Sequence, residues 1–194
     1  MKKEKTGDPW GNKLVKPEKV LDMLKPGMTV YLSTGVAEPR TLLKRLIHSD
    51  RYNISDLELI QVFSFGEAIF TKEINSHKYR LKTFFKGWIA DEAISSGRVD
   101  LIPGFFFQIP HLIGSGQISI DAAFIQITPP NAAGYCCLGV SVDAGRQAMK
   151  HADLVVGEIN DQIPHTFGDT FVPISDFDYV VNSEEPPIFC QRGC

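Results

Sequence analysis

Apolar positions along this chain form two kinds of pattern. Short, nearly continuous apolar runs predict buried strands, whereas apolar residues that recur once per helical turn predict helices. The strand-like runs fall at residues 28–32, 57–62, 80–85, 122–127 and 154–159, with shorter extended pieces at 171–174 and 179–181. The helix-like segments lie between them, at residues 17–24, 42–47, 87–97, 110–113 and 143–149. Strands that alternate with helices predict an α/β fold, with a mostly parallel sheet flanked by helices.

Two local features refine this pattern. Pro and Gly residues at 129–134 predict a tight turn, and we expect residues 135–140 to pair back across it as a short strand. Asp143 is expected to cap the helix that follows, since a carboxylate at that position accepts hydrogen bonds from the first helical N–H groups.

The pattern also predicts the domain organisation. Residues 1–15 are polar and predict a flexible N-terminal arm. Neither a repeat nor a linker interrupts residues 16–182, which we interpret as one α/β domain. The pattern is lost at 183–194, where Glu184-Glu185-Pro186-Pro187 predicts a linker or a tail towards an absent C-terminal domain.

Composition and charge exclude several classes of protein. Apolar residues make up 43% of the 194 residues and charged residues 22%, which is typical of a folded globular chain. The net charge of −3, without a basic block beyond the N-terminal lysines, gives no electrostatic footprint for nucleic acid. Apolar runs are far shorter than the ~20 residues of a membrane-spanning helix. The first residues lack the apolar core of a secretory signal, so we expect a cytoplasmic location and no membrane partner.

The cysteines do not predict a metal site. Cys136 and Cys137 are adjacent, so in a strand they point to opposite faces, and we interpret them as small buried residues. Cys190 and Cys194 nearly have the spacing of a zinc pair, but a second pair is missing. We therefore expect no metal.

Three polar loops that follow predicted strands are candidate sites. The first, residues 33–39, contains a single Gly, so it is neither a dinucleotide fingerprint nor a P-loop, and it remains either a tight turn or a ligand-contacting loop. The second, 126–135, is stiffened by Pro and Gly, and either lines a pocket or makes a hairpin. The third, 157–168, carries Glu158, which is either a nucleophile, base or orienting residue, or a structural carboxylate.

The same motifs resemble a known family. Residues 121–143 read DAAFIQITPPNAAGYCCLGVSVD, and residues 152–169 read ADLVVGEINDQIPHTFGD. Together with STGVAEP at 33–39, these segments resemble the N-terminal half of the acetyl-CoA hydrolase/transferase family, which includes 4-hydroxybutyrate and butyryl-CoA:acetate CoA-transferases. The resemblance runs from about residue 16 to residue 181. Asn131 stands where the family usually has an acidic residue and His165 where it often has Arg, which leaves the acyl specificity open.

The resemblance implies a fold and a reaction. The fold would be NagB/RpiA/CoA-transferase-like, and the reaction would pass coenzyme A, as a substrate, from an acyl-CoA to a short carboxylate through a glutamyl-CoA intermediate. In the family that Glu lies in the second half, so no catalytic residue is assigned in this chain. The residues expected to contact substrate lie in the three loops: Ser33, Gly35, Glu38, Pro130, Asn131, Asn160, Gln162 and Thr166.

The resemblance also implies partners and leaves alternatives. The expected partners are an acyl-CoA, a short-chain carboxylate and a C-terminal CoA-transferase half, and an exposed apolar face would favour a homo-oligomer. This chain alone is expected to be inactive. The alternatives are the corresponding half of an acetyl-CoA hydrolase, and a non-catalytic carboxylate-binding, CoA-binding or vestigial fragment.

Overall fold

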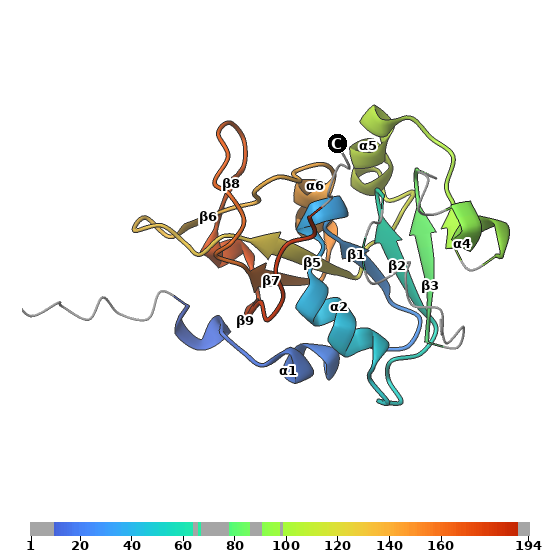
Figure 1. The fold of residues 1–194 in the computed structure, drawn as a ribbon, viewed down its shortest axis with the longest axis horizontal. Coiled ribbons are helices and arrows are strands. Elements are labelled where there is room, and N and C mark those ends of the chain that lie inside the picture. The colour runs from blue at the N-terminus through green and yellow to red at the C-terminus, as the bar shows by residue number, and fades with distance from the viewer. Residues whose placement is uncertain (1–9, 64–65, 67–77, 86–90, 98, 190–194) are drawn as a thin grey trace, which may run out of the picture.

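The expected parallel sheet is present. The computed structural model describes residues 10–63, 66, 78–85, 91–97 and 99–189. Within these residues, seven parallel strands form one sheet in the order β4-β3-β2-β1-β5-β7-β9 (Figure 1). The strands are β1 Thr29–Leu32, β2 Leu57–Gln61, β3 Tyr79–Thr83, β4 Val99–Leu101, β5 Ala122–Ile127, β7 Leu154–Ile159 and β9 Tyr179–Asn182.

The strand order reverses direction once. From the central strand β1 the chain adds β2, β3 and β4 on one side, then crosses to β5 and adds β7 and β9 on the other. Strands β1 and β5 pair directly, with Val30 opposite Ala122 and Leu32 opposite Phe124. The loops that leave these two strands therefore diverge at the carboxyl edge of the sheet. Open parallel sheets bind their ligands at such a topological switch point.

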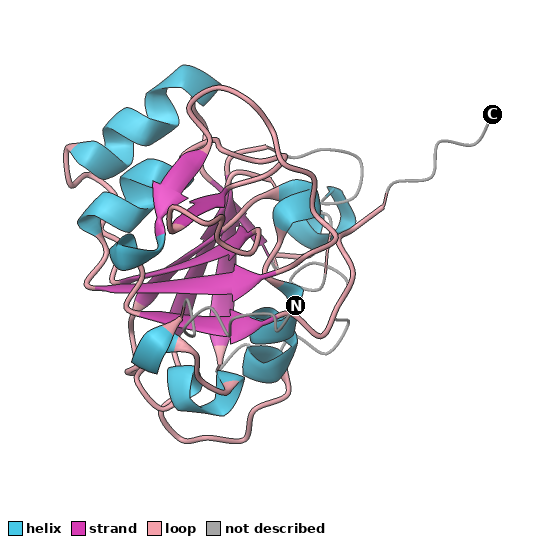
Figure 2. Ribbon diagram, turned by 90° about the vertical axis from the view of Figure 1, so that its left-hand side faces the viewer, coloured by secondary structure: helices cyan, strands magenta, loops and turns pink. Residues whose placement is uncertain are grey.

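Helices cover both faces of the sheet (Figure 2). The helices are α1 Pro17–Leu21, α2 Arg40–Ile47, α4 Asp91–Ser95, α5 Ile109–Gly114 and α6 Gly145–His151. The expected helix start at 87–90 lies outside the described residues. Alternate strand residues point to opposite faces. Val30 and Leu32 thus pack in a core with α1 and α2, while Tyr31 packs in a second core with α5 and α6.

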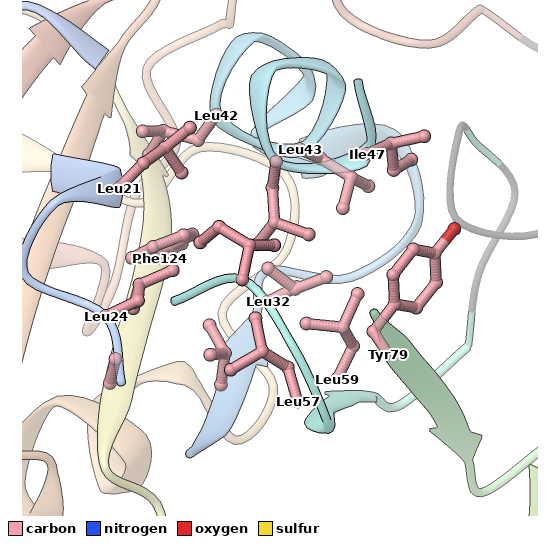
Figure 3. Close-up of a cluster of buried hydrophobic side chains, with 14 of the residues drawn as sticks. Leu21, Leu24, Leu32, Leu42, Leu43, Ile47, Leu57, Leu59, Tyr79 and Phe124 are labelled. Atoms are coloured by element: carbon pink, nitrogen blue, oxygen red, sulfur yellow. The ribbon is translucent and has the colours of Figure 1, made fainter. Parts of the chain in front are cut away.

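Apolar side chains of α2 explain why this segment is a helix on this face. Leu43 points towards Leu32 of the sheet, while Leu42 lies beside Leu21 and Ile47 lies on the side of Tyr79 (Figure 3). Each is buried, and burying a Leu or Ile side chain contributes about 1.5–3 kcal/mol relative to leaving it exposed. The same spacing that predicted the helix therefore also anchors it.

The pairing expected for residues 135–140 is different in the structure. Strand β6, Tyr135–Cys137, forms its antiparallel ladder with β8, Phe171–Pro173. The segment also bonds back to the loop after β5, through Thr128 N–H to Cys137 O at 2.9 Å and Asn131 N–H to Tyr135 O at 2.8 Å. The reason is that both edges of β5 are already paired, with β1 and β7, so a third strand cannot join its ladder.

The cap expected at Asp143 also needs correction. The N-cap of α6 is Ala144, and Asp143 precedes it in a left-handed conformation with a φ of 22°. The carboxylate still accepts a hydrogen bond from Gly145 N–H at 3.1 Å and another from the Tyr31 hydroxyl. Asp143 therefore stabilises the helix start from one position further out and ties it to β1.

Both ends of the described chain are bonded to the domain. Residues 10–15 were expected to be part of a flexible arm, but Val15 N–H donates to Val180 O of β9 at 2.9 Å, and the Lys13 ammonium donates to carbonyls at 174–177. At the other end, Lys44 of α2 forms an ion pair with Glu185 at 2.8 Å. The described parts of both segments are thus packed against the sheet and α2.

Candidate functional site

Buried polar side chains gather where the strands end at the carboxyl edge. Four of them form what we term the carboxyl-edge cluster: Ser33, Glu38, Gln61 and Gln126. They come from the loop after β1 and from the last residues of β2 and β5. Polar side chains without solvent must find hydrogen-bond partners inside the protein.

The loop after β1 delivers Glu38 into this cluster. Gly35 begins the 3₁₀ turn η2, Gly35–Ala37, with a φ of 61°, a conformation that favours glycine. Gly35 N–H donates to Phe63 O at 3.1 Å, which ties the turn to the end of β2. Glu38 follows the turn and is fully buried. The Gly that the sequence singled out therefore shapes the loop and is itself buried.

Two glutamine amides hold Glu38 from either side. Gln61 Nε2 donates to Glu38 Oε2 at 3.1 Å and to Ser33 O at 3.2 Å. Gln126 Nε2 donates to the Glu38 carbonyl at 3.1 Å. Ser33 Oγ accepts a hydrogen bond from Gln126 N–H at 3.1 Å, which closes the cluster across β1 and β5.

A glycine packs directly on the Glu38 carboxylate. A Cβ built on Gly66 would lie 2.0 Å from Glu38 Oε1 and 2.6 Å from Ile188 Cδ1. Only a residue without a side chain fits at this position as the chain stands. Glu38 thus lies among Gln61 of β2, Gln126 of β5 and Gly66, with Ile188 of the C-terminal segment beside Gly66.

The two glutamines also carry unused acceptors. Within the described chain, Gln61 Oε1 and Gln126 Oε1 are buried and have no hydrogen-bond partner. Leaving a buried polar atom unpaired costs about 1–3 kcal/mol. An O–H or N–H donor placed beside these oxygens would recover that free energy.

Glu158 has a structural role in this geometry. Its carboxylate is fully buried and accepts hydrogen bonds from the backbone N–H groups of Thr41 at 3.1 Å and Leu42 at 2.9 Å, in the first turn of α2. The Ser183 hydroxyl donates to the same carboxylate at 2.7 Å. Burial raises the pKa of Glu158, and the hydrogen bonds from Leu42, Ser183 and Thr41 oppose that rise. Of the two roles left open by the sequence, the contacts favour the structural carboxylate.

Asn160 connects the end of β7 to the C-terminal segment. Its Oδ1 accepts a hydrogen bond from Gln162 N–H at 2.9 Å, and its Nδ2 donates to Glu185 O at 3.1 Å. Asn160 is buried, whereas the Gln162 side chain is exposed. The contacts of Asn160 therefore fix the chain path, and Gln162 remains available to solvent.

The remaining predicted site residues, Pro130, Asn131 and Thr166, lie in loops, and two of them form hydrogen bonds within those loops. Asn131 is exposed, and its Oδ1 accepts hydrogen bonds from Ala133 and Tyr135 N–H at 3.0 Å each, so it closes the hairpin. Pro130 precedes it and is half-buried. Thr166 Oγ1 donates to Gly139 O at 2.7 Å. The structure thus brings Ser33, Gly35 and Glu38 together in the carboxyl-edge cluster and its loop. Asn131 and Thr166 instead stabilise the loops in which they lie.

Cys136 and Cys137 are buried and free, as the sequence indicated. Burial and the neighbouring Cys137 raise the pKa of the Cys136 thiol to about 12. Burial also raises the pKa of Cys137, but hydrogen bonds from Thr166, Thr170 and Gly139 outweigh it and lower that pKa below its usual value. Cys190 and Cys194 lie outside the described residues. Among those that are described, no group of three His, Cys, Asp or Glu side chains could hold a metal ion.

Sequence reasoning did not name the two glutamines as site residues, although Gln126 begins the candidate loop 126–135. Each lies near the end of an otherwise apolar strand, in LELIQ at 57–61 and AAFIQI at 122–127. A lone amide in such a run, placed at the carboxyl end of a parallel strand, is a signal that could have identified them.

A helix long and apolar enough to cross a membrane is not found among the described residues.

The chain is similar in sequence to proteins named as CoA-transferases. The chain is 34% identical over 174 residues to 4-hydroxybutyrate coenzyme A transferase of Clostridium kluyveri, covering 90% of this chain and 40% of that protein. It is 32% identical over 170 residues to succinyl-CoA:acetate/propanoyl-CoA:succinate CoA transferase of Fasciola hepatica, covering 87% and 35%. The chain therefore spans less than half the length of these relatives.

Solved structures show the same fold. RipA from Yersinia pestis superimposes with a TM-score of 0.82 at 25% identity, over 96% of this chain and 46% of that one. A 4-hydroxybutyrate CoA-transferase from Porphyromonas gingivalis superimposes with a TM-score of 0.69 at 25% identity, over 94% and 42%.

The family is given by a match along nearly the whole chain. Residues 1–190 match the family described as the acetyl-CoA hydrolase/transferase N-terminal domain. The sequence relatives and the solved structures agree with this match. This chain therefore belongs to the acetyl-CoA hydrolase/transferase family, in its N-terminal domain.

Proposed function

We propose that this chain is the N-terminal part of an acyl-CoA:carboxylate CoA-transferase. The observation that carries the proposal is the carboxyl-edge cluster, which lies at the switch point between β1 and β5 in a chain whose relatives are CoA-transferases. Polar groups at such a switch point are typical of ligand sites in open parallel sheets. The acyl groups named for the relatives differ, so we propose a short carboxylate of the 4-hydroxybutyrate, acetate or butyrate type as the acceptor.

The reaction would proceed by covalent catalysis. A Glu carboxylate attacks the thioester of the acyl-CoA, giving an acyl-glutamyl anhydride and releasing CoA thiolate. The thiolate attacks the glutamyl carbonyl, giving a glutamyl-CoA thioester and the free acid. The acceptor carboxylate then opens that thioester by the same two steps in reverse. Splitting one acyl transfer in this way replaces a difficult step by easier ones.

We place that nucleophile outside this chain. Glu158 is excluded on geometry, because three donors occupy its buried carboxylate and hold the first turn of α2. Glu38 is fully buried beneath Gly66, with Gln61 bonded to it. Neither carboxylate can approach a thioester without breaking these contacts.

The contribution of this chain would be to line the substrate site. Ser33, Gly35 and Glu38 would fix the loop that faces the substrate, and Gln61 and Gln126 hold that loop through their hydrogen bonds to Ser33 and Glu38. Pro130, Asn131, Asn160, Gln162 and Thr166 would shape the outer wall. Backbone N–H groups at the same edge could stabilise the oxyanions that form at the reacting carbonyl.

A coupled assay tests this proposal. The 194-residue chain is supplied with acetyl-CoA and a panel of short carboxylates, alone and together with the separately expressed C-terminal part of the Clostridium kluyveri relative. We expect no turnover by the chain alone and turnover on mixing. Turnover by the chain alone that survives Glu158→Ala and Glu38→Ala would overturn the proposal.

The same assay distinguishes the alternatives. Release of CoA without an acceptor acid would identify a hydrolase half, in which water completes the reaction. Binding of CoA or carboxylate without turnover in the mixture would indicate a binding module. A cytoplasmic location and a homo-oligomer also belong to this proposal, and cell fractionation and light scattering test them.

A further inference from the structure

Aromatic side chains follow the carboxyl ends of β2, β3 and β4. Phe63 comes after β2, Phe85 after β3 and Phe106 after β4. Their rings form a row, with centroids 6.0 Å apart from Phe63 to Phe85 and 6.0 Å apart from Phe85 to Phe106. Such separations are typical of favourable aromatic pairs. The row thus leads along the carboxyl edge from β2 to β4.

The outer end of this row is exposed to solvent. Phe105, Phe106 and Phe107, which we term the Phe triad, are 68%, 51% and 76% exposed. The rings of Phe105 and Phe107 stack on each other with centroids 5.8 Å apart. Three consecutive exposed phenylalanines form an apolar patch, and such patches mark interaction surfaces in soluble proteins.

The Phe triad is held in place rather than loosely displayed. It lies on the 3₁₀ turn η3, Phe106–Gln108, where Gln108 N–H donates to Phe105 O at 2.9 Å. The helix α5 follows directly, and its Ile109 and Ile113 are buried in the core. A preorganised aromatic surface loses little conformational entropy when a partner binds it.

The course of the chain indicates which partner covers this surface. The side chain of Ile188 lies against Gly66, at the carboxyl edge and a few residues from Phe63, and Phe189 beyond it is exposed. The described chain therefore leaves the domain on the edge where the aromatic row begins. The relatives continue well beyond this point, since the chain covers 40% of the Clostridium kluyveri protein and 35% of the Fasciola hepatica protein.

We propose that the Phe triad is the docking surface for the C-terminal part of the full-length protein. This inference rests on the proposed function, because it requires a C-terminal half. It goes further in assigning the contact to Phe105, Phe106 and Phe107 on the β4–α5 connection. The surface is apolar, so the partner presents an apolar face to it, and its burial excludes water from the neighbouring carboxyl edge.

The test measures binding and does not depend on turnover. Wild type and the double variant Phe105→Ser/Phe107→Ser are titrated by calorimetry with the C-terminal parts of the two named relatives. Phe106 is kept because its ring packs on Phe85. We expect the Kd of the double variant to be higher than that of wild type by a factor of about ten or more, as for the loss of aromatic anchors at an interface.

The control uses an exposed aromatic residue outside the candidate site loops. Tyr52 lies between α2 and β2 and is 93% exposed, so Tyr52→Ser should leave binding unchanged. Circular dichroism and thermal unfolding check that all variants fold. Equal binding by the double variant and wild type, or no binding of wild type to either C-terminal part, would overturn the proposal. A homodimer of the chain that the double variant dissociates would assign the surface to a second copy and also overturn it. Binding without turnover would instead contradict only the proposed function.

Discussion

Glu158 on β7 accepts a hydrogen bond from the backbone N–H of Leu42 at 2.9 Å, across 116 positions in the sequence. Helix α2 begins with N–H groups that have no partner within the helix. Glu158 satisfies those of Thr41 and Leu42 and places a carboxylate at the positive end of the helix. The second strand from the sheet edge thereby fixes the helix that follows the loop carrying Glu38.

This relationship predicts that Glu158 contributes to stability. Glu158→Ala leaves the buried N–H groups of Thr41 and Leu42 without their acceptor, whereas the Ser183 hydroxyl keeps Glu185 O at 3.0 Å, so we expect a loss of about 2–3 kcal/mol in the free energy of unfolding. Urea denaturation measures it. Glu184→Ala is the control, since Glu184 pairs with Arg45 at an exposed site, where solvent screens the pair and its loss should cost much less. Equal losses in the two variants would show that the buried cap has no special role.

Gly66→Ala should disturb Glu38. The added Cβ would lie 2.0 Å from Glu38 Oε1, so either the carboxylate or the Gly66 segment must move, at a cost of about 1–3 kcal/mol. Gly104→Ala is the control, because nothing lies within 4 Å of a Cβ at that position. In a Glu38→Ala background the cost of Gly66→Ala should shrink, which a double-mutant cycle detects. An undiminished cost would locate the clash elsewhere.

The pKa of Cys136 predicts a pH effect on stability. The pKa is raised to about 12 in the folded protein, whereas an unfolded thiol titrates near about 8.5. Its stabilising contribution is therefore complete below the unfolded pKa and decreases as the pH rises above it, since only the unfolded thiol then loses its proton. Cys136→Ala removes this effect. The stability difference between wild type and Cys136→Ala should accordingly be smaller at pH 10 than at pH 7, and an unchanged difference in urea midpoints would contradict the assignment.

Gln61 and Gln126 should matter more for activity than for stability. Gln126→Met removes a buried, unpaired oxygen together with one hydrogen bond, so the two effects on folding partly cancel. In the reconstituted enzyme we expect kcat/KM to fall about tenfold or more, because the loop that carries Glu38 loses a hydrogen bond that positions it. Gln117→Met, at an exposed loop position, is the control. Full activity of Gln126→Met would remove this residue from the proposed site.

Much of the fold could be predicted because apolar periodicity reports burial. The runs at 122–127 and 154–159 coincide with β5 and β7, whose residues are almost all buried. The partner of β6 could not be predicted, since periodicity does not show that both edges of β5 are occupied. Periodicity also does not fix the first residue of a helix, so Asp143 was placed one residue too close to α6.

The site was predictable in part. Ser33, Gly35 and Glu38 follow a strand in a Gly-containing turn, and that local signal identified the loop. The role of Glu158 depends on α2, which is distant in sequence, and the roles of Gln61 and Gln126 depend on the neighbouring strands. The spacing of residues along the sequence does not show these contacts between distant segments. The chemistry itself came from the family resemblance.

The most direct test of the account is to locate the covalent intermediate. The chain and the C-terminal part of the Clostridium kluyveri relative are mixed with an acyl-CoA. The reaction is stopped with acid, without borohydride, so that a thioester adduct is preserved, and both chains are analysed by intact-protein mass spectrometry. We predict a CoA thioester adduct on the C-terminal part and an unmodified 194-residue chain. An adduct on a Glu of this chain would contradict the central claim that the nucleophile lies outside it.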